Sequence, residues 1–123
     1  MAKPAATRRQ EYAEQTRNAL IEAATQRMVE QGYEATSIAQ IAADVRVSKG
    51  AVYHHFPDKR SLFKAVFSEV TSRSVATVAE SMDHMRNSPP DDVVGMAIDA
   101  ALTTALKDRE YSVLRQQAAA ILS

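Results

Sequence analysis

Apolar residues recur at three- and four-residue steps along most of the chain, the spacing that places side chains on one face of a helix. The first such stretch runs from Gln10 to Gln31. Its apolar positions are Ala13, Leu20, Ala23, Ala24 and Met28, with Ile21 beside them. Gly32 follows the last periodic residue and is typical of a helix C-cap. We therefore expect a helix over residues 10–31.

Two short helices are predicted after it, around a tight turn at Arg46 and Val47. Their inward-facing positions are Ile38, Ile41, Ala42, Val52 and Phe56. Ser37 and Ser48 are the expected N-caps, because a serine hydroxyl accepts hydrogen bonds from the unpaired N–H groups of a first turn. Together with the first helix they predict a three-helix bundle that contains a helix-turn-helix.

A long connecting helix is predicted over residues 58–87. Pro57 breaks the preceding pattern, and Asp58 is placed to cap a helix that begins at Lys59. From there the apolar spacing continues for about six turns. A helix of this length would connect the two halves of the chain.

Residues 88–123 are expected to begin a second helical domain. A Ser-Pro-Pro sequence at 88–90 supplies a cap and a proline for a new helix. Two helices are predicted, one over residues 91–107 and one from Asp108 or Arg109 onward. The chain ends within the apolar pattern of the last helix, so we expect a fragment, a truncation or an incompletely built chain.

The composition favours an all-α fold of one ordinary domain or two small ones. Of the 123 residues, 46% are hydrophobic and only three are glycine. The absence of cysteine excludes disulfides and thiolate zinc sites. Neither a membrane-spanning apolar run nor a signal peptide is visible in the sequence. We therefore expect a soluble, cytoplasmic protein that does not bind membranes.

Charge is distributed unevenly although the net charge is zero. Residues 1–60 contain nine Lys and Arg against seven Asp and Glu, and residues 61–123 contain six against eight. Residues 1–9 contribute three of the basic residues and are expected to be a flexible arm. The modest positive bias therefore lies with the predicted helix-turn-helix, where it would favour contact with nucleic acid.

The outward side of the second short helix combines small, basic and aromatic residues. Opposite its two inward positions lie Gly50, Ala51 and His54, flanked by Tyr53 and His55, with Lys49 in the first turn. Small residues permit close approach to a partner, and the others supply hydrogen-bond donors, as expected of a helix that enters a major groove. The alternative is an ordinary solvated helix face.

Taken as a whole, residues from about Arg17 to Phe67 resemble the DNA-binding domain of TetR-family transcriptional regulators. The matching positions are Ala23-Ala24, Gly32-Tyr33, Ala35-Thr36, Ile41-Ala42, Val47 to Gly50, Val52-Tyr53, His55-Phe56, Lys59 and Leu62-Phe63. The chain departs from the family at Arg46, where the turn usually has glycine in a left-handed conformation. An arginine with the same backbone would cost roughly 1 kcal/mol relative to glycine.

The resemblance implies a DNA-binding domain over residues 10–57 and an effector domain from residue 88, linked by the helix of 58–87. It implies a ligand-responsive repressor that binds a palindromic operator as a homodimer, with an unknown small-molecule effector. The expected DNA-binding residues are Ser37, Ser48, Lys49, Gly50, Ala51, Tyr53, His54, His55 and Lys59. Of these, Ser37, Tyr53, His54 and Lys59 are the expected phosphate contacts.

Lys59 is singled out by its position as well. It places a cation at the positive end of a helix dipole, which is unfavourable unless an anion lies nearby, and a DNA phosphate would be such an anion. No pattern of catalytic residues, metal ligands or a phosphate-binding loop occurs, so we expect neither an enzyme nor a cofactor. The alternative function is a helical module that contacts other proteins and does not bind DNA.

Overall fold

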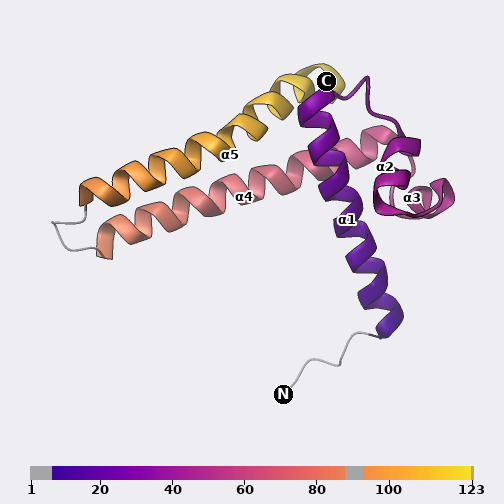
Figure 1. Cartoon of the computed structure of the whole chain (residues 1–123), viewed down its shortest axis with the longest axis horizontal. Helices are drawn as coiled ribbons and strands as arrows, with labels where there is room; N and C mark the ends of the chain where they lie inside the picture. Colours follow the sequence, from indigo (N-terminus) through magenta and orange to yellow (C-terminus); the bar gives the residue numbers. More distant parts are fainter. Residues whose placement is uncertain (1–6, 88–92, 123) are drawn as a thin grey trace. The chain divides into compact units, whose positions relative to one another are not determined.

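The computed structural model describes residues 7–87 and 93–122, and within these ranges every regular element is an α-helix (Figure 1). The helices are α1 (Arg8–Gln31), α2 (Ile38–Val45), α3 (Lys49–His55), α4 (Lys59–Asn87) and α5 (Val93–Ile121). The predicted all-α fold is confirmed. The chain forms two compact units, one over Met1–Val66 and the other over Phe67–Ser123.

Helix α1 begins two residues earlier than the pattern predicted. Thr7 caps it, since its Oγ1 accepts from the N–H of Gln10 at 3.2 Å, while the Gln10 Oε1 accepts from the N–H of Thr7 at 3.0 Å. This reciprocal capping box holds Arg8 and Arg9 in the helix. Residues 1–6 of the expected flexible arm lie outside the described residues.

The predicted caps around α2 and α3 are confirmed. Gly32 ends α1 at a φ of 88° and donates its N–H to the Met28 carbonyl at 3.1 Å. Ser37 and Gln40 form a second capping box, with both bonds at 3.1 Å. The Ser48 Oγ accepts from the N–H of Ala51 at 3.1 Å. Each helix of the predicted bundle therefore begins where a side chain satisfies its first N–H groups.

The first unit buries most of the apolar positions that the spacing assigned to its core, although Ala13 and Ala23 are only half-buried. The buried side chains are Leu20, Ile21, Ala24, Met28, Ile38, Ile41, Ala42, Val52, Phe56, Leu62, Phe63 and Val66. Two buried threonines satisfy their own hydroxyls: Thr25 donates to the Ile21 carbonyl at 2.7 Å, and Thr36 donates to that of Gly32 at 2.8 Å. This core is therefore built without an unpaired buried hydroxyl at these sites.

Helix α4 begins at Lys59, as predicted, because the Asp58 carboxylate accepts from the N–H of Ser61 at 2.7 Å. The same bond lowers the pKa of Asp58. The division between the compact units falls after Val66, within α4. The physical reason is that Leu62, Phe63 and Val66 in the first two turns of α4 belong to the buried core.

The second unit consists of the remainder of α4 and helix α5. The rings of Phe67 and Tyr111 stack with centroids 5.9 Å apart, and Val70, Thr77 and Leu114 are buried. The prediction of two helices here is wrong, because α5 runs unbroken from Val93 to Ile121. The charged sequence at 107–110 contains no glycine or proline, so nothing in its backbone chemistry ends a helix.

The proposed Ser-Pro-Pro cap at 88–90 lies outside the described residues. Within 7–87 and 93–122, no helix combines the length and the apolar character needed to cross a membrane.

Candidate nucleic-acid interface

The turn between α2 and α3 is closed by a left-handed residue. Arg46 has φ 64° and ψ 45°, and among the described residues no other non-glycine has a positive φ. The N–H of Val47 donates to the Ala42 carbonyl at 3.0 Å, and that of Arg46 donates to the Ala43 carbonyl at 3.2 Å. These two bonds form a Schellman motif, in which glycine usually occupies the left-handed position. The turn therefore keeps its left-handed geometry despite the arginine.

Helix α3 presents to solvent the surface that the sequence predicted. Val52 is fully buried and Phe56 is 4% exposed. On the outer side Lys49, Gly50, Tyr53 and His54 are exposed, while Ala51 and His55 are half-buried. Helix α3 has only seven residues and is anchored by Val52 within it and by Phe56 directly after it. Most of its surface is therefore available to a partner.

Gly50 has no internal packing reason to be glycine. A Cβ built on it would meet only the Ser48 Oγ, at an ordinary contact distance of 3.8 Å. A glycine inside a helix costs roughly 0.5–1 kcal/mol relative to alanine. The fold alone would therefore favour alanine at this position.

The two cap serines keep the capacity to donate a hydrogen bond. The hydroxyls of Ser37 and Ser48 each accept an N–H of their own helix. A hydroxyl has one donor and two lone pairs, so its hydrogen remains able to reach a phosphate oxygen. The Gln40 Oε1 that accepts from the Ser37 N–H also accepts from the Gln31 Nε2 at 3.0 Å. Gln31 therefore holds the capping partner of Ser37 in place.

Lys59 is held by Tyr33, a contact that the sequence did not reveal. Its Nζ donates to the Tyr33 carbonyl at 2.9 Å and lies 4.2 Å from the centroid of the same residue's ring. That ring meets Phe63 edge-on at 5.4 Å, and burial raises the pKa of its hydroxyl. An ammonium group has three donors, so Lys59 can hold the loop after α1 and still donate to a phosphate.

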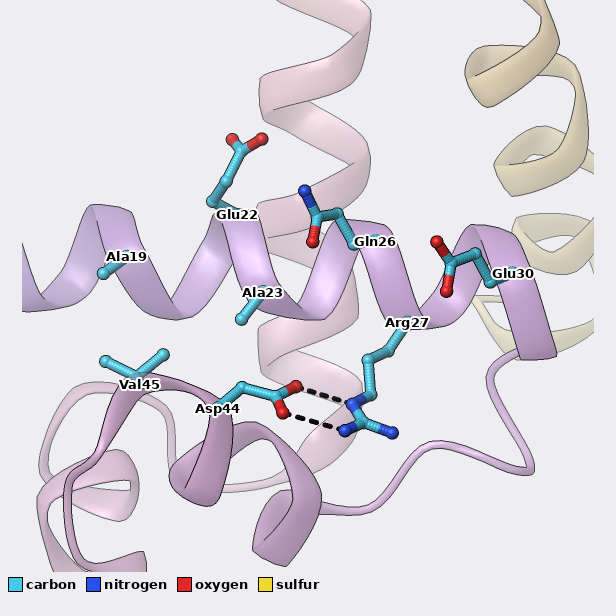
Figure 2. Close-up of a pocket in the computed structure, with 8 residues that line it drawn as sticks. All are labelled: Ala19, Glu22, Ala23, Gln26, Arg27, Glu30, Asp44 and Val45. Atoms are coloured by element: carbon cyan, nitrogen blue, oxygen red, sulfur yellow. Dashed lines mark hydrogen bonds and ion pairs between the residues drawn. The ribbon is translucent and has the colours of Figure 1, made fainter.

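The helix-turn-helix is tied to α1 by a bidentate ion pair, shown in Figure 2. The Arg27 Nε and Nη2 lie 2.6 Å and 2.8 Å from the two carboxylate oxygens of Asp44. The hydrogen bonds lower the pKa of Asp44 and raise that of Arg27. Both residues line an open groove of about 620 Å³. Seventeen residues separate the partners, so no local pattern could have predicted the pair.

His54 and His55, neighbours at the end of α3, meet edge to face. Their rings are 5.3 Å apart at an interplanar angle of 82°. The pKa of His55 is lowered by burial and then by the positive charges of His54 and Arg17. In the part of the chain that the structure describes, no group of three His, Cys, Asp or Glu side chains is placed to hold a metal ion.

Arg17 is a neighbour of this site that the sequence did not identify. It lies on α1, and its guanidinium carbon is 5.4 Å from the ring centroid of Phe56. Phe56 directly follows α3, so the contact joins α1 to the end of the outward-facing helix. The only sequence signal was its basic character within the matched region.

Comparison with known proteins finds similarity in the same helix-turn-helix region. Residues 20–66 match the model of the family described as bacterial regulatory proteins, tetR family. The HTH-type transcriptional regulator CymR of Pseudomonas putida is 36% identical over 107 residues, which cover 84% of this chain and 49% of that protein. The HTH-type transcriptional repressor AcnR of Corynebacterium diphtheriae is 37% identical over 65 residues, covering 53% of this chain and 34% of the relative.

A solved structure from Shewanella sp. PV-4, assigned to the tetR family of transcription regulators, superposes with a TM-score of 0.61 at 30% identity. The superposed region covers 82% of this chain and 53% of the solved chain. The chain thus spans between about a third and a half of the length of these relatives.

Proposed function

The chain belongs to the TetR family of bacterial regulatory proteins, and on that premise we propose that it binds operator DNA by placing α3 in a major groove. The observation that carries the proposal is the surface of α3. Two inward side chains anchor the helix, while its small, basic and aromatic residues face solvent. A helix used only for packing would have no need of this surface.

We assign the residues of the interface by their chemistry. Lys49 lies in the first turn of α3, where an ammonium group can reach the O6 and N7 of a guanine. Gly50 and Ala51 allow the backbone of α3 to approach the base edges. The remaining contacts are assigned to the DNA backbone or the groove edge and belong to Ser37, Ser48, Tyr53, His54, His55 and Lys59.

TetR-family regulators are non-enzymatic DNA-binding proteins, so no catalytic step is assigned to this chain. We further propose repression as the outcome of binding, a role supported by the repressors among its relatives. Since bacterial operators lie on cytoplasmic DNA, the cytoplasm is the proposed location.

We extend the proposal to a homodimer on a palindromic operator. Two copies of α3 would then read half-sites about 34–36 Å apart, which is one turn of the duplex. A small-molecule effector is proposed for the complete regulator. Within the second unit, an open and mainly apolar groove of about 420 Å³ supports this idea; Val75, Val78 and Met82 of α4 and Tyr111 of α5 contribute to its lining.

The test is a selection of bound duplexes from a randomised library, followed by affinity measurements over a range of salt concentrations. We expect an enriched sequence and a linear fall of log affinity with log salt. Enriched half-sites one turn apart would support the dimer. Loss of both enrichment and salt dependence would refute DNA binding and favour a module that contacts proteins.

A further inference from the structure

We propose that Arg17 extends the DNA interface from α3 onto α1 by binding a backbone phosphate from its position over Phe56. The inference rests on the proposed function and adds a residue that lies outside the helix-turn-helix. No motif of the sequence pointed to α1 as a DNA-binding element.

The position of Arg17 on α1 is unusual for a charged side chain. It lies three residues before Leu20 and seven before Ala24, both buried, and therefore belongs to the inward-facing stripe of the helix. Arg17 is nevertheless exposed, because the described residues of α1 before Leu20 include none that is buried. The N-terminal half of α1 thus extends past the core, and Arg17 lies where that half meets the end of α3.

The guanidinium group of Arg17 lies over the ring of Phe56. The distance of 5.4 Å from the guanidinium carbon to the ring centroid is within the range of a cation–π contact. A guanidinium resting on a ring keeps the N–H donors at its edges, which match the geometry of a phosphate. Phe56 itself is almost completely buried, so the core holds this platform in place.

The charges around Arg17 favour an anion. Arg17 makes no ion pair with any carboxylate of the described residues, in contrast to Arg27 on the same helix. On α3 the charge of Arg17 acts on His55, and together with burial and His54 it lowers the pKa of that imidazole. Arg17 therefore adds a positive group beside the last turn of α3. Its position next to the proposed DNA-reading helix selects the duplex backbone as the partner.

The test uses Arg17→Gln in the full chain, with a fluorescent duplex of mixed sequence as the probe, titrated at several salt concentrations. The slope of log affinity against log salt should decrease in magnitude by about one unit, the value of one lost phosphate contact. Arg17→Lys should keep the slope of the wild type because it keeps the charge. Arg115→Gln, a change at an exposed arginine of α5, is the matched control and should also leave the slope unchanged.

The outcomes separate this inference from the proposed function. If the wild-type chain shows salt-dependent binding while Arg17→Gln keeps its slope, the inference is wrong and the function stands. An equal loss in Arg115→Gln would also refute it, because general charge would then explain the effect. A fall in melting temperature that accounts for the lost affinity would assign Arg17 a structural role instead. A wild-type chain without salt-dependent binding would refute the proposed function itself.

Discussion

The two compact units of the chain differ in which large apolar side chains they expose to solvent. Among the described residues of the first unit, the exposed large hydrophobic residues are Tyr12 and Tyr53, whose hydroxyls suit them to water. In the second unit they are aliphatic: Val75, Val78, Met82 and Ile98, among the residues whose side chains are described. The first unit has thus enclosed its core, whereas the second leaves aliphatic side chains in contact with solvent.

The difference follows from the number of helices that share each core. In the first unit α1, α2, α3 and the start of α4 all contribute buried side chains. In the second unit α5 lies along the rest of α4, and two helices cover only one side of each other. A surface of exposed aliphatic residues marks a place where a ligand or a further protein surface can bind. The first unit therefore buries its apolar side chains within its own helices, whereas the second unit leaves an aliphatic surface exposed.

The largest expected effect tests this contrast directly by mutation of one apolar residue in each unit. Phe63→Ala removes a fully buried ring that packs against Tyr33, and it should lower the free energy of unfolding by about 3–5 kcal/mol. Met82→Ala truncates a side chain that is 57% exposed and should change it by less than about 0.5 kcal/mol. Denaturant titrations of the two variants make the comparison. Similar losses would show that the second unit has a closed core as well.

A second prediction concerns DNA recognition, which we place in the first unit. Lys49→Ala should cost about 1–3 kcal/mol of binding free energy at one base-pair position, because a contact to a guanine would be lost. Its affinity for unrelated duplexes should change much less. Lys64→Ala, at an exposed lysine of α4, is the control. Equal weakening of Lys49→Ala on every sequence would assign Lys49 to a phosphate.

The local features of the first unit could be predicted because each depends on residues close in sequence. Helix starts are predicted by the capping side chains of Ser37, Ser48 and Asp58, and a helix end is predicted by Gly32. The apolar spacing then identified most of the core. The same logic failed at 107–110, where the pattern predicts that a new helix starts at Asp108 or Arg109. Charged residues are compatible with a continuous helix, so α5 passes through them.

The contacts that position the candidate site could not be predicted, because they join distant parts of the chain. Lys59 lies against Tyr33, 26 residues away, and Arg27 pairs with Asp44. Arg17 reaches Phe56 only because α1 and α3 pack on one core. The sequence therefore indicated which residues of α3 face outward, while the fold was needed to see how the candidate site is held in place.

A third prediction uses Lys59, whose ammonium group lies against Tyr33. Lys59→Ala should weaken binding to all duplexes alike and reduce the magnitude of the salt slope by about one unit. Arg60→Ala, the neighbouring exposed arginine, should do less. A thermal melt of Lys59→Ala separates the lost contact to Tyr33 from the lost phosphate. An unchanged salt slope would leave Lys59 with only a structural role in the first unit.

A fourth prediction tests the strained turn of the first unit. Arg46→Gly should raise the free energy of unfolding by up to roughly 1 kcal/mol, because glycine adopts a φ of 64° without a steric penalty. The gain is partly offset by the larger conformational entropy of glycine in the unfolded chain. Thermal melting measures the balance. Clear destabilisation would mean that the arginine side chain contributes more than the strain costs.

A fifth prediction, on Gly50 of α3, separates the contribution of a residue to the fold from its contribution to DNA binding. Gly50→Ala should stabilise the first unit by roughly 0.5–1 kcal/mol, since alanine is the better helix residue. No internal atom opposes the change, because the added Cβ would meet only the Ser48 Oγ at 3.8 Å. If α3 approaches base edges as closely as proposed, the same methyl group should weaken specific DNA binding. Gly95→Ala in α5 is the matched control, since its Cβ would also have open space. Melting and binding should therefore move in opposite directions for Gly50→Ala, whereas Gly95→Ala should leave DNA affinity unchanged. A Gly50→Ala chain that is more stable and binds its selected duplex at full strength would show that α3 does not make the proposed close approach.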